Sequence, residues 1–123
     1  MQIIHTNAAP AAVGPYSQAV VTGSLIYTAG QVPLDPETGL IVGSDVTEQA
    51  HQVMKNLAAV LAAAGTGLDK AVKTTCFLAD MADFGAFNAV YAEYFPNKPA
   101  RSCVAVKELP KGALCEVEVI AEL

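Results

Sequence analysis

The chain has 123 residues, a net charge of −5 and 53% hydrophobic residues. This length fits one domain, spanning 1–123, with one core. The six lysines are scattered between Lys55 and Lys111 without a basic stripe, which argues against nucleic acid as a partner. The longest apolar run, 57–64, is too short to span a bilayer, so we expect no membrane partner and a cytoplasmic location.

The charged residues are few for a chain of this size. They make up 15% of the sequence, against about 25% in an average soluble domain. Since a thin polar coat suits a surface that is partly covered by a neighbour, the composition predicts apolar surface buried between subunits.

The residues that commonly hold metals or act as nucleophiles are sparse. The three cysteines are widely spaced and odd in number, so we expect reduced thiols and no disulfide framework. The two histidines, His5 and His51, are too few for a histidine metal cluster or a Ser-His-Asp triad, and neither phosphate-binding glycine motif occurs. The sequence therefore predicts no metal site.

The first half of the chain predicts a hairpin and a helix. The apolar runs 17–22 and 25–29 flank Gly23-Ser24, a pair typical of a type II′ turn. An irregular loop rich in Pro and Gly follows. Asp45 and Glu48 then have the spacing of a capping box, and apolar residues recur at intervals of three and four up to Gly65. We expect one amphipathic helix over residues 46–64.

The second half predicts a strand at 71–79, a helix at 83–95 and two strands at 101–107 and 114–122. On the first of these strands, Val72 and Thr74 should share a face. The short connection after 107 allows the last two strands to pair antiparallel. The fold class is therefore α+β, in the order ββαβαββ, with both helices covering one face of the sheet. An aromatic stripe on the second helix indicates a core or subunit contact; its residues are Phe84, Phe87, Tyr91 and Tyr94.

Arg101 is the only arginine and is the first candidate for a binding residue. Its guanidinium can hold a carboxylate or phosphate through two parallel hydrogen bonds, although a salt bridge without function is the more common role. Glu116 and Glu118 share one face of the last strand, and their spacing does not distinguish between them. A simple hairpin register places Arg101 opposite Ile120, roughly 13 Å from Glu116.

Several motifs taken together resemble the YjgF-type Rid family, the reactive intermediate/imine deaminases, and they cover almost the whole chain in the family's order. The motifs are Gly14-Pro15-Tyr16-Ser17-Gln18-Ala19, Ala29-Gly30-Gln31, Asp83-Phe84 with Asn88 and Tyr91, Pro99-Ala100-Arg101-Ser102-Cys103, and Leu109-Pro110 before Glu116.

The resemblance implies a bacterial chorismate-mutase-like fold that assembles as a homotrimer around a central barrel, with sites in the clefts between subunits. It also implies hydrolysis of 2-iminobutanoate and 2-iminopropanoate, the small-molecule 2-imino acids that follow from pyridoxal-phosphate dehydratases, to 2-oxo acids and ammonia. The family needs no cofactor for this reaction.

The resemblance also implies roles for individual residues. Arg101 would bind the substrate carboxylate and Glu116 would activate water. Tyr16, with the backbone of Gly30 and Gln31, would shape the pocket, and the main chain of Cys103 would help to hold the water. For Asn88, either a direct role or a structural bridge is open.

Two departures from the family pattern affect the pocket. Ala29 replaces a serine found in many relatives, which removes one polar contact, and the segment 95–99 is shorter than in some of them. The main alternative function is a non-catalytic protein of the same fold that binds or senses a small acid. Ribonuclease and chaperone activities are further alternatives, and the acidic balance counts against the former.

Overall fold

The computed structural model describes all residues from 1 to 123. Its helices and strands are β1 (Gln2–Ile4), β2 (Ala19–Thr22), β3 (Leu25–Thr28), α1 (Val46–Ala63), β4 (Ala71–Leu78), α2 (Phe84–Tyr94), β5 (Ala100–Ala105) and β6 (Cys115–Glu122). Three short 3-10 helices are η1 (Leu68–Lys70), η2 (Met81–Asp83) and η3 (Pro110–Gly112). None of the helices combines the length and apolar character that crossing a bilayer requires.

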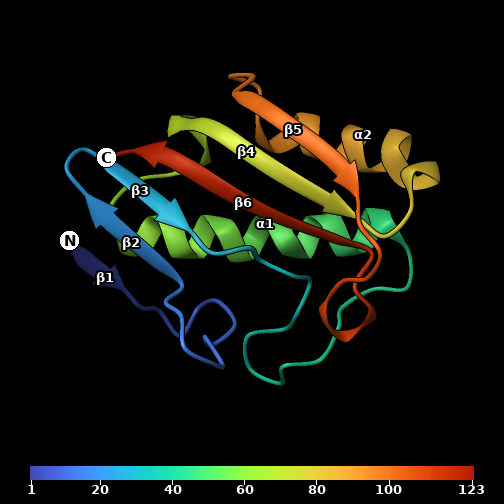
Figure 1. Cartoon of the computed structure of the whole chain (residues 1–123), viewed down its shortest axis with the longest axis horizontal. Helices are drawn as coiled ribbons and strands as arrows, with labels where there is room; N and C mark the ends of the chain where they lie inside the picture. The colour runs from blue at the N-terminus through green and yellow to red at the C-terminus, as the bar shows by residue number, and fades with distance from the viewer.

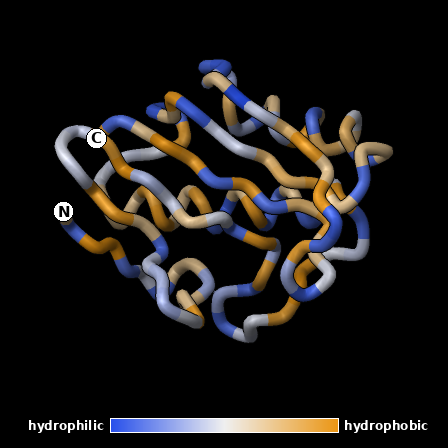
Figure 2. The backbone as a smooth tube through the Cα atoms, in the orientation of Figure 1, coloured by the Kyte–Doolittle hydropathy of each residue, from blue (hydrophilic) through white to orange (hydrophobic).

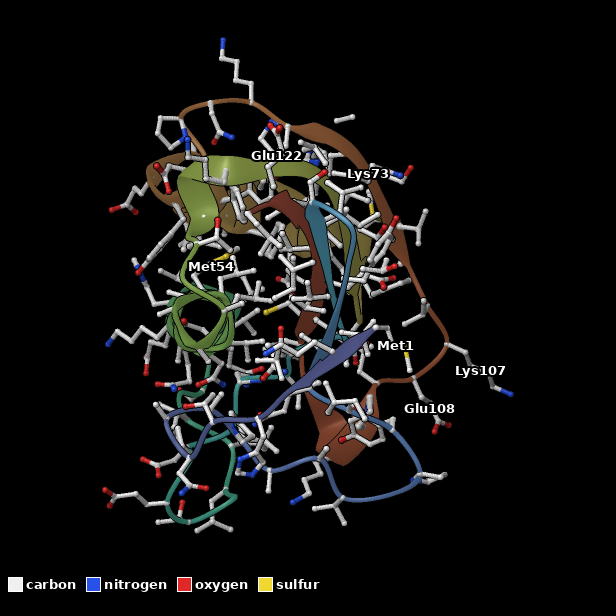
Figure 3. All side chains as sticks on the ribbon, turned by 90° about the vertical axis from the view of Figure 1, so that its left-hand side faces the viewer. Met1, Met54, Lys73, Lys107, Glu108 and Glu122 are labelled. Carbon is white, nitrogen blue, oxygen red and sulfur yellow. The ribbon has the colours of Figure 1, made fainter.

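One six-stranded sheet, in the order β1-β2-β3-β6-β4-β5, forms the body of the molecule (Figure 1). Only β4 and β5 run parallel; every other neighbouring pair is antiparallel. Both helices lie behind the sheet in Figure 1, and Figure 3 shows α1 end-on with side chains filling the space between it and the sheet. This confirms the predicted α+β fold with two helices on one face.

The predicted hairpin and first helix are confirmed. Gly23 has a φ of 58°, and Thr22 pairs with Leu25 across the turn. The Asp45 side chain accepts a hydrogen bond of 2.9 Å from the backbone N–H of Glu48, and Gly65, with a φ of 82°, lies just after the helix. Both glycines adopt the left-handed backbone that other residues avoid. The strand β1 is additional, because a segment of three residues carries too short a pattern to be seen in the sequence.

The expected pairing of the last two strands is wrong. Strand β4 lies between β5 and β6 and pairs with both of them. The connection from β5 to β6 passes around the end of β4, where Val106 N–H donates to Leu78 and Ala79 N–H donates to Leu114. Arg101 is therefore opposite Thr74 on β4 and not opposite Ile120 on β6.

A register shift also changes the beginning of β4. The pairing with β6 is irregular between Ala71 and Lys73, so Ala71 turns inward and Val72 outward. Val72 is 39% exposed, whereas Thr74 is fully buried, and the two do not share a face as predicted. A bulge of this kind inserts one residue and reverses the alternation that a regular strand would have.

The two faces of the sheet differ in character. Inward residues of β6, from Cys115 to Ala121, pack with α1 and α2 in a core of 22 buried residues. The helix-free face carries partly exposed apolar side chains, among them Tyr27 and Val104, together with Glu116 and Glu118. Figure 2 shows short hydrophilic stretches within otherwise hydrophobic strands, and in Figure 3 Lys73 lies on the side of the sheet away from α1.

The segment before β2 is fixed by one buried amide. Gln18 is 2% exposed; its carbonyl oxygen accepts from Thr6 N–H at 2.7 Å, and its amide nitrogen donates to Thr6 O at 3.0 Å and Pro10 O at 2.8 Å. A buried polar group without partners costs free energy, so this side chain matches the backbone that it binds. It thereby anchors the loop that carries Tyr16.

We predict that Gln18→Met lowers the free energy of unfolding by about 2 kcal/mol, because the change leaves buried backbone groups without partners. Urea denaturation at one fixed protein concentration measures the effect. The control Gln2→Met, on exposed β1, should stay within about 0.5 kcal/mol of the parent. Equal losses in the two variants would contradict the anchoring role of Gln18.

Candidate active site

Arg101 lies on β5, at the edge of the sheet, and its side chain points toward α2. Its Nη1 donates a hydrogen bond of 2.7 Å to Asn88 Oδ1. The guanidinium carbon lies 4.7 Å from the ring centroid of Tyr91 and 5.5 Å from that of Phe84, which is cation–π geometry. The aromatic rings and the amide therefore fix the plane of the guanidinium.

The remaining donors of Arg101 are available for an anion. Asn88 is its one side-chain hydrogen-bond partner in the chain, and no acidic side chain lies within salt-bridge distance of the guanidinium. A hollow of about 370 Å³ opens beside the guanidinium. Its lining contains two cations and no acid: Asn88, Tyr91, Ala92, Phe95, Pro96, Lys98, Pro99 and Arg101. We call the group of Arg101, Asn88, Phe84, Tyr91 and Cys103 the Arg101 cluster.

Glu116 lies on the opposite, helix-free face. Its carboxylate packs on the backbone of Gly30, where a Cβ would clash with Glu116 Oε2. The same carboxylate lines a second hollow of about 330 Å³. The lining residues are Ala11, Val13, Tyr16, Gly30, Val32, Leu34, Pro110, Lys111 and Glu116. We call the group of Glu116, Gly30, Gln31 and Tyr16 the Glu116 cluster.

Burial raises the pKa of Glu116 above its ordinary value, and the negative charge of Glu118 raises it further. Both effects disfavour the ionised form and make the carboxylate a better proton acceptor once it is ionised. This environment distinguishes Glu116 from Glu118, which the sequence alone did not. The backbone of Gly30, which approaches the carboxylate closely, contributes to this burial.

Backbone pairing places Gly30 and Gln31 beside Glu116. Gln31 N–H donates to Val117 O at 2.9 Å, and Val117 N–H donates to Gln31 O at 3.2 Å. Tyr16 reaches the same hollow from the loop before β2, and its side chain is 54% exposed. The structure therefore brings four of the predicted site residues together in the Glu116 cluster.

The three thiols have little tendency to ionise. Burial raises the pKa of Cys76 and of Cys115 to about 12, and it also raises the pKa of Cys103, against which Arg101 acts in the opposite direction. The thiolate is the nucleophilic form of cysteine. Cys103 therefore contributes to the Arg101 cluster through its position and backbone more readily than through thiol chemistry.

The two clusters do not meet within one chain. Thr74 pairs with Arg101 and Phe77 pairs with Glu116, so the two Cα atoms are three residues apart along the sheet and two strands apart across it. This corresponds to roughly 14 Å, with the side chains on opposite faces. This separation is close to the roughly 13 Å expected from the sequence. The expected direct pairing of β5 with β6, from which that value was obtained, was wrong because β4 lies between the two strands.

Sequence reasoning missed the aromatic support of Arg101. Tyr91 was assigned to a core or subunit contact, and it does hydrogen-bond Thr74 in the core at 2.7 Å, but its ring also stacks on the guanidinium. The available signal was spacing: Phe84, Asn88 and Tyr91 follow one another at four and three residues, which puts them on one side of α2.

Comparisons with known proteins agree with this architecture. Residues 6–123 match the profile of the family described as Endoribonuclease L-PSP. The 2-iminobutanoate/2-iminopropanoate deaminase of Mus musculus is 50% identical over 121 residues, which are 98% of this chain and 90% of the mouse protein. Other relatives carry the general name of RutC family protein.

Solved structures superpose along the full length. RidA from the Antarctic bacterium Psychrobacter sp. gives a TM-score of 0.95, and E. coli TdcF with bound serine gives 0.94; each is 42% identical, and the matches cover 100% of this chain, 100% of the RidA chain and 99% of the TdcF chain. The chain belongs to the Endoribonuclease L-PSP family, which is also the family of the RidA and RutC proteins.

We predict that Glu116→Gln raises the thermal midpoint of unfolding at neutral pH. Because the pKa of Glu116 is raised in the folded state, its ionisation is less favourable there than in the unfolded chain, so the carboxylate lowers stability above that pKa. Below the ordinary glutamate pKa both states are protonated, and the gain should disappear.

Calorimetry of the variant and parent across this pH range measures the gain. Glu122→Gln, at the exposed end of β6, is the matched control and should show no such pH dependence. A midpoint for Glu116→Gln that falls at neutral pH would contradict the assigned environment of Glu116.

Proposed function

We propose that the protein hydrolyses 2-iminobutanoate and 2-iminopropanoate to 2-oxo acids and ammonia. The observation that carries the proposal is the pair of clusters: a stacked guanidinium with free donors, and a half-buried carboxylate whose pKa is raised. A small 2-imino acid needs one group for its carboxylate and another to activate water at its imine carbon. The mouse relative carries the name of this activity.

The proposed site lies between two copies of the chain. Arg101 is on an edge strand near α2, and Glu116 is on the helix-free face, so one copy supplies the first cluster and a neighbouring copy the second. The partly exposed apolar residues of that face, Tyr27 and Val104 among them, suit burial against a partner. A homotrimer that closes its helix-free faces around a central barrel would bring the two clusters of neighbouring copies together and would bury the apolar residues of that face.

In the proposed reaction, Arg101 binds the substrate carboxylate through two parallel hydrogen bonds, while Asn88 keeps the guanidinium in plane. Asn88 therefore acts as a bridge to Arg101, one of the two roles left open by the sequence. Tyr16 and the backbone of Gly30 and Gln31 line the reacting end, and the main chain of Cys103 helps to hold the water.

The proposed hydrolysis has two steps, the addition of water to the imine and the loss of ammonia. Glu116 accepts a proton from water as the water oxygen bonds to the imine carbon, and that proton passes to the imine nitrogen to give a carbinolamine. Glu116 then takes the proton of the carbinolamine hydroxyl and passes it to the amino nitrogen, so that the C–N bond breaks as the C=O bond forms, and ammonia leaves with a 2-oxo acid. Water is the only co-reactant, so no cofactor is required by this scheme.

A second candidate is a non-catalytic protein that binds or senses a small acid in the same place. E. coli TdcF, with the same fold, has been solved with bound serine, a molecule that carries a carboxylate beside a nitrogen. Binding of a 2-oxo or amino acid without turnover would identify this function. A ribonuclease is less compatible with the net charge of −5 and the scattered lysines.

We predict that Arg101→Ala and Glu116→Ala each lower kcat/KM for imine hydrolysis by at least about a hundredfold. The first removes charge-assisted hydrogen bonds worth about 1.5 to 3 kcal/mol each, and the second removes a general base worth about 10² to 10⁴ in rate. A dehydratase-coupled assay that follows ammonia release measures both.

Glu118→Ala is the matched control for Glu116, and its activity should stay within about tenfold of the parent, since general-base catalysis remains intact. Arg101→Lys should not rescue activity, because an ammonium cannot reproduce the planar pair of donors. Full activity in either alanine variant would refute its assigned role, and a larger loss at Glu118 than at Glu116 would exchange the two glutamates.

A further inference from the structure

Three amide side chains form a stripe on α1. Gln49, Gln52 and Asn56 follow one another at intervals of three and four residues, which places them on one side of the helix. Gln49 is 4% exposed and Asn56 is 1% exposed, on a helix whose other buried residues are apolar. Buried amides are costly unless they are hydrogen-bonded, so their partners indicate what they do.

Asn56 binds the loop that follows β3. Its amide nitrogen donates to Val32 O at 3.1 Å and to Leu34 O at 3.0 Å. Gln52 Nε2 donates to Asn56 Oδ1 at 2.9 Å, which turns the NH₂ group of Asn56 toward the loop. Both the NH₂ group and the carbonyl oxygen of the Asn56 side chain therefore have hydrogen-bond partners.

Gln49 binds two other segments of backbone. Its Oε1 accepts from Leu114 N–H at 2.8 Å, and its Nε2 donates to Gly43 O at 3.2 Å. Leu114 lies two residues before Glu116, and Gly43 lies at the far end of the loop that begins at Gly30. In Figure 1 this loop runs from β3 past the start of β6 toward α1.

Glu116 lies between the segments that these amides hold. The segment fixed by Asn56 begins with Gly30 and Gln31. The backbone of Gly30 packs on the Glu116 carboxylate, and Gln31 pairs with Val117. The segment fixed by Gln49 leads directly into β6. Any movement of the Gly30 segment away from β6 would open the carboxylate to water.

We propose that Asn56 and Gln49 are positioning residues for the imine-hydrolysing site, which hold the Gly30 segment and the start of β6 together and so limit the access of water to the Glu116 carboxylate. The expected effect on kcat rests on the proposed function. The expected effect on the environment of the Glu116 carboxylate does not depend on catalysis.

Few other groups can alter the titration of Glu116, and in the proposed assembly they include Arg101 of a neighbouring copy, whose positive charge lowers the pKa. Glu118 is on the same strand, and Tyr16 and Lys111 line the same hollow from other segments, with Lys111 Nζ donating to Gly39 O at 3.0 Å. On the neighbouring strand β4, the residue opposite Glu116 is Phe77, which carries no charge. A change at Asn56 leaves all of these groups in place chemically.

The test compares Asn56→Leu and Gln49→Met with Leu61→Val, a control on α1 that removes buried apolar volume on a side of the helix away from the amide stripe. Titration of the Glu116 carboxyl carbon by NMR, in the intact assembly, reports the environment directly. We expect both amide variants to lower the pKa of Glu116 toward its ordinary range, and the control to leave it unchanged. An unchanged pKa in Asn56→Leu would overturn the proposal.

The kinetic arm uses the same proteins. The acid limb of the pH–kcat profile should move to lower pH in the amide variants, and kcat at neutral pH should fall about tenfold, because a small displacement of a reacting group costs this much or more. Leu61→Val should shift neither. If Asn56→Leu does not fold, Gln52→Ala replaces it in the test, because this variant removes only the hydrogen bond that orients the Asn56 amide. A lower pKa of Glu116 in Gln52→Ala supports the proposal, and an unchanged pKa overturns it. Absence of turnover in the parent would refute the proposed function, while the NMR titration would still decide the positioning role.

Discussion

Arg101 and Glu116 are held on opposite faces of one sheet by the two-residue period of β-strands. Strand β4 lies between their strands and pairs with both, so the register of β4 fixes the face that each side chain takes. No rotamer change brings a guanidinium and a carboxylate together through a sheet. In the proposed reaction, a site that uses both residues therefore takes them from two chains, which makes the assembly part of the proposed chemistry.

Each half of the proposed site is preorganised by its own surroundings. Arg101 is fixed by the Asn88 amide and by the rings of Phe84 and Tyr91, so little side-chain entropy is lost when an anion binds. Glu116 is partly desolvated by the backbone of Gly30, which raises its pKa. The helix-free face combines this carboxylate with exposed apolar residues, which agrees with a chain that carries few charges.

The sequence predicted the helices and most strands because their signals are local. Asp45 with Glu48, Gly23 and Gly65 each act through a few neighbouring residues. The placement of β4 between β5 and β6 depends on contacts far apart in the sequence, so the short connection before β6 was misread as a hairpin. Arg101 and the pair Glu116 and Glu118 were candidates from the residues alone, and the family resemblance supplied the choice of Glu116 and the remaining site residues. The division into two clusters, the support from Tyr91 and the amide stripe on α1 became visible only in three dimensions.

The most direct test of the two-chain site is subunit mixing. Arg101→Ala and Glu116→Ala chains, each inactive alone, are denatured together in equal amounts and refolded, and imine hydrolysis is measured. In a randomly mixed closed trimer, about a quarter of the interfaces combine an intact Arg101 with an intact Glu116, so about a quarter of parental activity should return. Mixed assemblies that form, as shown by mass spectrometry, but remain as inactive as the separate variants would contradict a site shared between two copies.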